Sequence, residues 1–173
     1  MPSVRIHNIK DLRGWLQKNH TINESVWLEY KKQSAGNDFG WSEIVDELLC
    51  WGWIDSLPRK VDDIWTSIRI SSRNPKSRWS KINKDKIRVL EEQGRIQPSG
   101  YAIIDIAKSN GAWNALDDVE NLILPNDFES YLREHNLMKI WEQKPKSFKR
   151  GFLEQLLDAK KPETREKRFR SLE

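Results

Sequence analysis

The stretch CWGWIDSLPRKVDDIWTSIRISSRNPKSRWSKIN, residues 50–83, decides the fold because it contains the clearest strand signal in the chain. In IWTSIRIS, isoleucine or threonine alternates with tryptophan, serine or arginine, the period of two that is typical of a half-buried strand. WIDSLPRKV precedes it, and a short acidic turn, Asp62-Asp63, separates the two runs. The stretch therefore predicts an antiparallel hairpin near residues 53–71. Pro58 lacks a donor for the ladder and places the first strand at an edge or at a bulge.

The rest of the chain adds one more strand and several helices. SVWLEYKK, residues 25–32, alternates apolar and polar side chains and predicts a third strand. Apolar residues at helical spacing, bounded by glycine or proline, predict five to seven helices. We therefore expect an α+β fold with a small antiparallel sheet of about three strands, covered by these helices. No repeat or change of composition marks a boundary, so we expect a single domain over residues 1–173.

The composition favours a compact soluble protein. The chain has nine tryptophans, five phenylalanines and three tyrosines, whereas disordered sequences are poor in aromatic residues. Cys50 is the only cysteine, which excludes an intramolecular disulfide. The N-terminal residues lack the apolar segment of a signal peptide, and no run approaches the roughly 20 apolar residues of a membrane span. We therefore expect a cytoplasmic protein without a membrane span.

The net charge of +4 is distributed unevenly along the chain. Residues 69–88 contain eight lysines and arginines and one acid, and residues 144–170 contain ten against four acids. Two basic segments in an otherwise acidic chain indicate an anionic partner, although two solvated helix faces would explain the same charges. Nucleic-acid binding through segments 69–88 and 144–170 is one hypothesis that follows.

The order of several motifs is similar to that of a known bacterial family. The motifs are VWLEYKK, SEIVDELLCWGWIDS, SSRNPKSRWSKIN, LEEQGRIQPSGYAIIDIAKSNGAW and LLDAKKPETREKRFR. On these motifs the chain resembles the YdeI/OmpD-associated, or bacteriocin-protection, family over essentially its whole length, from Leu12 to Arg168. The resemblance implies a small α+β domain with a link to antimicrobial-peptide tolerance and without an established biochemical activity.

The resemblance also selects candidate site residues. The family's central pattern is close to GWID-G, an aromatic strand, F-x-P-R and S-x-W-S-x-x-N. This chain has Ser56, Ile70 and Ser72 where glycine, an aromatic residue and proline are usual. Because Ser72 replaces the proline, the resemblance does not imply the backbone conformation of the residue before Arg73. The resemblance implies that a shared ligand-binding site is formed by the residues that remain: Trp53, Asp55, Arg69, Arg73, Ser77, Trp79, Ser80 and Asn83.

Two of these residues, Arg69 and Arg73, carry the clearest functional signal. They are four residues apart and project to the same side of a straight strand, where two guanidinium groups suit a carboxylate or a phosphate. A helix start near Ser77 would add free backbone N–H groups. We therefore predict a binding domain for an anionic small molecule or an acidic peptide near the hairpin and the turn at residues 73–83. Ordinary N-capping by Ser77 or Asn83, with exposed arginines, explains the same residues without a ligand.

Asp55 supports a third hypothesis, an enzyme with Asp55 and Arg73 in a pocket. On a regular strand Asp55 shares a face with Trp53, Leu57 and Arg59, and a carboxylate among apolar neighbours must be paired, hydrogen-bonded or protonated. A structural ion pair that fixes the hairpin is the alternative. The sequence has no phosphate-binding glycine loop, no nucleophile elbow and no His/Cys pair at metal-ligand spacing. It therefore predicts no metal and no cofactor.

The tryptophans near the hairpin have two interpretations. Trp53, Trp65 and Trp79 bracket the basic stretch, and indoles interleaved with cations can stack bases in single-strand binders. The same indoles can simply pack a small sheet. The sequence favours packing for most of them.

Overall fold

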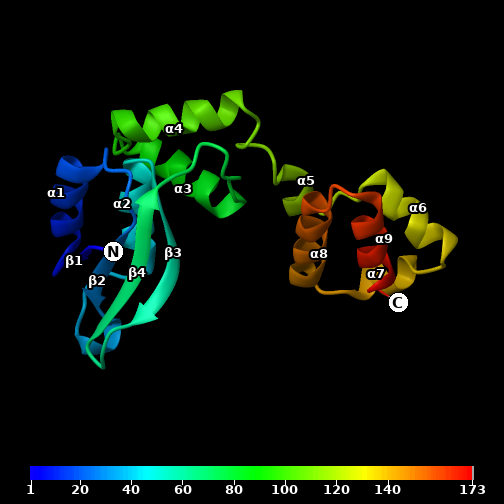
Figure 1. Ribbon diagram of the computed structural model, residues 1–173, viewed down its shortest axis with the longest axis horizontal. Helices are drawn as coiled ribbons and strands as arrows, with labels where there is room; N and C mark the ends of the chain where they lie inside the picture. The colour runs from blue at the N-terminus through cyan, green and yellow to red at the C-terminus, as the bar shows by residue number, and fades with distance from the viewer. Residues whose placement is uncertain (173) are drawn as a thin grey trace. The chain divides into compact units, whose positions relative to one another are not determined.

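The computed structural model describes residues 1–172 of the chain (Figure 1). The chain forms two compact units, Met1–Asn114 and Ala115–Glu173, and each has a hydrophobic core of its own. Because a division into compact units does not show whether either unit folds alone, the single domain over residues 1–173 stays a prediction.

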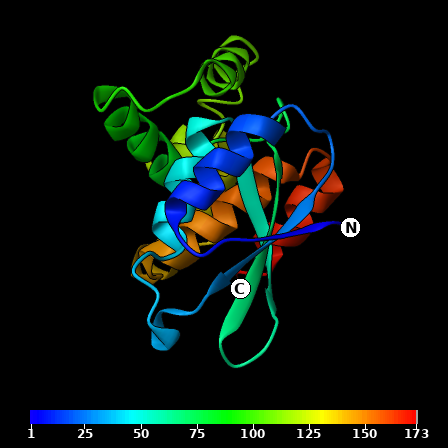
Figure 2. The same ribbon diagram turned by 90° about the vertical axis from the view of Figure 1, so that its left-hand side faces the viewer.

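The first unit contains a four-stranded sheet in the order β1-β2-β4-β3 (Figures 1 and 2). Its strands are β1 (Ser3–Arg5), β2 (Val26–Lys31), β3 (Trp53–Lys60) and β4 (Trp65–Ser72). The sheet is mixed rather than antiparallel, because β1 runs parallel to β2 while the other neighbours are antiparallel. The α+β class is confirmed, and the predicted hairpin corresponds to β3 and β4. The sequence missed β1 because three residues are too few to show a period of two.

Helices and one 3-10 turn complete the first unit: α1 (Ile9–Asn19), η1 (Gln33–Ala35), α2 (Trp41–Cys50), α3 (Lys81–Glu92) and α4 (Pro98–Ser109). α1 begins with a capping box, in which Asn8 Oδ1 accepts the backbone N–H of Asp11 and the Asp11 carboxylate accepts the N–H of Asn8. α3 is capped by Ser80, whose Oγ accepts the N–H of Asn83. These polar caps fix the residues at which the two helices begin.

The core of the first unit lies on one face of the sheet. Alternate residues of β2 and β4 point into it, together with the apolar stripes of α1 and α2: Val26, Leu28, Ile68, Ile70, Leu12, Leu16, Ile44 and Leu48. All of these side chains are at most 4% exposed. α1 and α2 therefore cover one side of the sheet, and the intervening strand residues point to the other side.

A second cluster joins the end of α2 to α3 and α4. Gly100 allows the close approach, because a Cβ at this position would lie 2.3 Å from the carbonyl oxygen of Cys50. Burial raises the pKa of the Cys50 thiol to about 11. A buried and protonated thiol is inert, so Cys50 packs the core and does not act as a nucleophile.

The second unit is entirely helical in its described part, with α5 (Asp117–Glu120), α6 (Asn126–Glu134), α7 (Met138–Gln143), α8 (Lys146–Asp158) and α9 (Pro162–Arg170). Phe128 of α6 is fully buried at its centre, and its ring contacts those of Trp141, Phe152 and Phe169 at centroid distances of 5.1, 5.1 and 5.2 Å. Residues 1–172 thus contain nine α-helices rather than five to seven, because short helices such as α5 have too few residues to show a helical period. None of these helices is long and apolar enough to cross a membrane.

Candidate functional site

The two tryptophans among the eight predicted site residues are core residues. Trp53 is 0% exposed and Trp79 is 1% exposed. The indole N–H of Trp53 donates to the carbonyl oxygen of His20 at 3.0 Å, and its ring meets that of Trp15 edge to face. Neither indole can stack on a ligand without opening the core.

Arg73 is buried as well, whereas Arg69 and Arg78 of its segment are partly exposed and Arg88 is exposed. Its guanidinium lies over the ring of Trp79, with Cζ 3.8 Å from the ring centroid, and Nη2 donates to the carbonyl oxygen of Arg78 at 2.7 Å. Its Nε and Nη1 have no hydrogen-bond partner within residues 1–172. Burial lowers the pKa of Arg73 to about 10, an effect that the charge of Asp55 partly offsets.

Replacing Arg73 with methionine is expected to raise the free energy of unfolding by about 1–3 kcal/mol, because an apolar side chain removes an uncompensated buried charge. The destabilisation by the charge is complete at neutral pH and is relieved only as the pH rises through about 10, since the folded pKa of Arg73 lies below the ordinary pKa of an arginine. Urea denaturation at pH 7 measures the change, with the exposed Arg88→Met as a control that stays within about 0.5 kcal/mol. A less stable Arg73→Met protein would mean that the contacts with Trp79 and Arg78 outweigh the burial of the charge.

The other predicted residues do not converge on Arg73. The Arg69 Nε donates to Ser56 Oγ at 3.0 Å, so its guanidinium reaches toward β3. Ser77 donates its N–H to the carbonyl oxygen of Asn74, while Ser80 and Asn83 meet in the cap of α3. The structure thus pairs Arg73 with Trp79 and Ser80 with Asn83, and it places Arg69 with the hairpin.

Asp55 lies on the opposite side of the sheet from Arg59, which corrects the expectation that the two share a face. A bulge between Asp55 and Pro58 causes the difference: Asp55 pairs with Ile70, while Arg59 pairs with Ser67. The Asp55 Oδ2 accepts the indole N–H of Trp41 at 2.9 Å. This carboxylate therefore has a partner that sequence reasoning did not identify.

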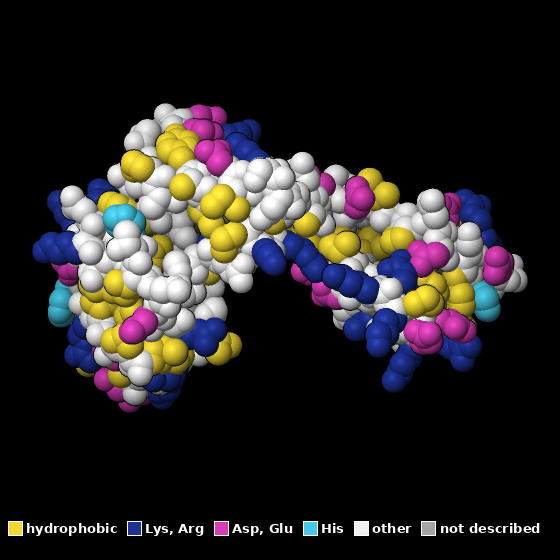
Figure 3. Space-filling view, turned by 45° about the horizontal axis from the view of Figure 1, so that its top comes forward, with side chains coloured by type: hydrophobic (Ala, Val, Ile, Leu, Met, Phe, Trp, Pro, Cys, Tyr) yellow, Lys and Arg dark blue, Asp and Glu magenta, His cyan; other side chains and the backbone are white. Residues whose placement is uncertain are grey.

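The two basic segments carry less unpaired positive charge in the structure than their sequences suggest. Segment 69–88 lies in the first unit and segment 144–170 in the second. At least five of their eighteen cations form ion pairs with acids, some of them outside the segments: Lys81–Asp85, Lys86–Asp46, Arg150–Glu120, Arg165–Asp127 and Arg170–Glu166. On the surface shown in Figure 3, Lys and Arg side chains of each unit are interspersed with Asp and Glu side chains.

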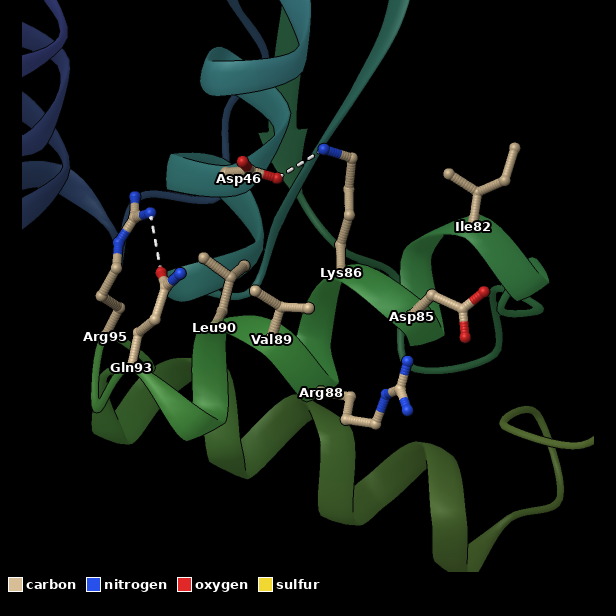
Figure 4. Close-up of a pocket in the computed structure, with 9 residues that line it drawn as sticks. All are labelled: Asp46, Ile82, Asp85, Lys86, Arg88, Val89, Leu90, Gln93 and Arg95. Carbon is tan, nitrogen blue, oxygen red and sulfur yellow. Dashed lines mark hydrogen bonds and ion pairs between the residues drawn. The ribbon is translucent and has the colours of Figure 1, made fainter.

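A pocket of about 460 Å³ lies on α3 beside α2 (Figure 4). Ile82 and Val89 of its lining are 69% and 44% exposed. Lys86 reaches across to Asp46 of α2, with Nζ 2.6 Å from Oδ1, and Arg95 Nη2 lies 3.1 Å from a carboxylate oxygen of the buried Glu47. Two of the three cations in the lining, Lys86 and Arg95, therefore already have carboxylate partners, and the third, Arg88, is exposed.

A different set of residues gathers on the side of the sheet that faces away from the core. Strand register places Trp27 opposite Arg69, Glu29 opposite Ser67 and Lys31 opposite Trp65. β1 adds Arg5 beside Glu29, and the shifted part of β3 adds Arg59 beside Ser67. We call this surface the cation–indole face, and it consists of Arg5, Trp27, Glu29, Lys31, Arg59, Trp65, Ser67 and Arg69.

Two arginines of the cation–indole face, Arg5 and Arg59, lie over its indoles. The Cζ of Arg59 lies 4.1 Å from the ring centroid of Trp27, and its Nε donates to Ser67 Oγ at 3.3 Å. The Cζ of Arg5 lies 4.3 Å from the ring centroid of Trp65, and Nε and Nη2 donate to one oxygen of Glu29 at 3.1 and 2.8 Å. Stacking on an indole is attractive and fixes the plane of the guanidinium.

The charges of this face are unbalanced. Arg5 has a carboxylate partner in Glu29, whereas Lys31, Arg59 and Arg69 form no ion pair within residues 1–172. Arg59 and Arg69 each use Nε in a bond to a serine, which leaves both Nη groups for a ligand. The arrangement can therefore bind negatively charged groups through donors that are already oriented.

Of the eight predicted site residues, only Arg69 belongs to this face, and Trp65 was named separately as an indole that can stack bases. The other residues of the face lie at alternate positions on four strands. The register of β1 and the bulge in β3 bring them together, and the alternation pattern of the sequence shows neither. The signal for the bulge was Pro58, which predicted an irregular strand but not the direction in which Arg59 would point.

Two family models match the chain in separate regions. The model described as "Domain of unknown function (DUF8412)" matches residues 4–103, which is more than half of the chain. The chain belongs to the DUF8412 family. The DUF8412 match contains the whole cation–indole face, from Arg5 to Arg69.

The second model, described as "Bacteriocin-protection, YdeI or OmpD-Associated", matches residues 121–172. The resemblance to that family was expected over essentially the whole chain and holds only for this C-terminal region, which corresponds to α6–α9. The central motifs that suggested it lie within the DUF8412 match instead. No curated protein and no solved structure matches the chain.

Proposed function

We propose that the first unit is a binding module for an anionic ligand, which it holds on the cation–indole face. The observation that carries the proposal is the set of three cations without carboxylate partners, Lys31, Arg59 and Arg69, on one side of a rigid sheet. The proposed site keeps the hairpin of the site that the sequence predicted. The proposed contacts move from the turn at residues 73–83 to the strands, because Arg73 is buried.

The geometry supports an anion more strongly than a neutral ligand. Arg59 is exposed and Arg69 is partly exposed, so a ligand can reach their Nη groups without opening the core. Both side chains are already ordered by serine bonds, and Arg59 also by its indole. Binding therefore loses less side-chain entropy than it would with free arginines.

Replacing Arg59 or Arg69 with glutamine is expected to weaken the binding of linear polyphosphate by about tenfold or more, because each loses charge-assisted hydrogen bonds worth about 1.5–3 kcal/mol. Isothermal titration calorimetry at about 50 mM salt measures the change. Arg88→Gln is the matched control, since Arg88 is exposed and lies on α3, outside the face. Equal losses in Arg88→Gln and Arg59→Gln would contradict a defined site and indicate attraction by net charge alone.

A further inference from the structure

We infer that the anionic ligand of the cation–indole face is a single-stranded nucleic acid, an inference that rests on the proposed function. A small anion needs only the cations. A small anion as the ligand would not explain why two partly exposed indoles, Trp27 and Trp65, lie among the cations. Indoles and guanidinium planes are the groups on which unpaired bases stack.

The two indoles form separate platforms. Trp65 pairs with Lys31, which is four residues beyond Trp27 on β2, so the two positions are about 13 Å apart along the strands at roughly 3.3 Å per residue. Each indole carries an arginine on its ring, Arg59 on Trp27 and Arg5 on Trp65. A base can stack on the outer plane of the guanidinium or displace it and stack on the indole.

The spacing selects an unpaired strand. Neighbouring bases in a helix are stacked about 3.4 Å apart, so platforms about 13 Å apart can engage only bases that have left such a stack. A duplex cannot take the whole sheet into its major groove. The outer strands of a four-stranded sheet are about 14 Å apart, and the major groove is about 12 Å wide. A duplex can therefore contact this face through its phosphates alone.

The unpaired cations lie beside the platforms. Lys31 Nζ is 5.8 Å from the ring centroid of Trp65, and Arg69 is the cross-strand partner of Trp27. Stacking a base at either indole therefore brings its phosphates near a cation. Glu29 is the one carboxylate of the face, and Arg5 neutralises it, so it does not repel the strand strongly.

An acidic peptide is less well matched to this surface. Its carboxylates could bind Arg59 and Arg69, but its backbone offers no planar group of the size of a base for the two indoles. The phosphates and the planar bases of a single strand use both kinds of group on the face.

The test compares three fluorescently labelled ligands by anisotropy at about 50 mM salt: a twelve-nucleotide mixed-sequence single-stranded DNA, the same sequence as a duplex, and an abasic strand with the same number of phosphates. We expect the single strand to bind at least tenfold more tightly than either of the others. Trp27→Ala and Trp65→Ala are each expected to reduce single-strand affinity by roughly tenfold and to reduce abasic-strand affinity much less, because Arg59 keeps its bond to Ser67 and Arg5 keeps its bonds to Glu29.

Trp41→Ala is the matched control, because Trp41 is 55% exposed and lies on α2, outside the face; it should leave single-strand affinity unchanged. Melting curves establish that each variant is folded, and the two face variants test the inference independently if one of them fails to fold. Equal affinity for the abasic strand and the DNA, with a loss in Arg59→Gln, would overturn the inference and leave the proposed function standing. The absence of binding to any of the three ligands and to polyphosphate would overturn both.

Discussion

Replacing Trp53 with alanine lowers the free energy of unfolding of the protein by roughly 3–5 kcal/mol, the usual cost of removing a large aromatic side chain from a core. The indole is 0% exposed and belongs to the cluster that joins the sheet to α1 and α2. It also donates its N–H to His20 and packs edge to face on Trp15. An alanine therefore leaves a cavity and an unsatisfied carbonyl oxygen together.

The loss is a large part of the 5–15 kcal/mol that stabilises a typical domain, so urea denaturation should show a much lower midpoint for Trp53→Ala. Trp41→Ala serves as the comparison, because this indole is 55% exposed and has one hydrogen bond, to Asp55. We expect it to cost no more than about 1 kcal/mol. Similar midpoints for the two variants would place Trp53 outside the core.

Replacing Glu47 with glutamine is expected to cost about 3 kcal/mol, the lower end of the range for breaking a buried ion pair. The carboxylate is 2% exposed and accepts two bonds from Arg13 at 2.9 Å and one from Arg95 at 3.1 Å. It thus links α1 and α2 to the residues that follow α3. The amide of a glutamine would turn its own N–H groups toward one of these arginines, and both arginines would lose their counter-charge.

The effect of this substitution should depend on pH. Burial raises the pKa of Glu47, but the bonds and charges of Arg13 and Arg95 more than compensate, so the pKa lies below its ordinary 4.5. The stabilisation is therefore complete above the pKa of the unfolded state and is lost as the pH falls through the folded pKa. Urea midpoints measured from pH 7 down to pH 3 should show the difference between wild type and Glu47→Gln shrinking below about pH 4.5.

Glu129→Gln is the matched control for this prediction. Glu129 forms an exposed i,i+4 pair with Arg133, and such pairs contribute about 0.3–0.5 kcal/mol. If Glu47→Gln and Glu129→Gln lowered the free energy of unfolding by the same small amount, the buried network around Glu47 would not stabilise the first unit.

The sequence predicted local structure well where the pattern was long enough to read. The alternation in residues 64–71 and the run before it predicted the hairpin. β1 was missed because its three residues are recognisable as a strand only from their pairing with β2. The short helix α5 was missed for the same reason, since four residues do not complete a pattern.

The candidate site was harder to predict, because it depends on register and burial. Arg69 and Arg73 are equivalent on a straight strand, but β4 ends at Ser72 and the chain then folds Arg73 onto Trp79. Arg59 looked like a neighbour of Asp55, and a single bulge turned it to the other face. Pro58 indicated an irregular strand, but local patterns do not show where Arg59 then points or that Arg73 is buried, because tertiary packing decides both.

The indole N–H signals in a ¹⁵N–¹H correlation spectrum show directly whether ligands bind on the cation–indole face. The chain has nine tryptophans, and each signal can be assigned by single Trp→Phe substitutions. On titration with single-stranded DNA, we expect the signals of Trp27 and Trp65 to move together, while those of the buried Trp53 and Trp79 stay in place. Saturating shifts confined to Trp41 and Trp113, with Trp27 and Trp65 unmoved, would place the ligand elsewhere and contradict the account.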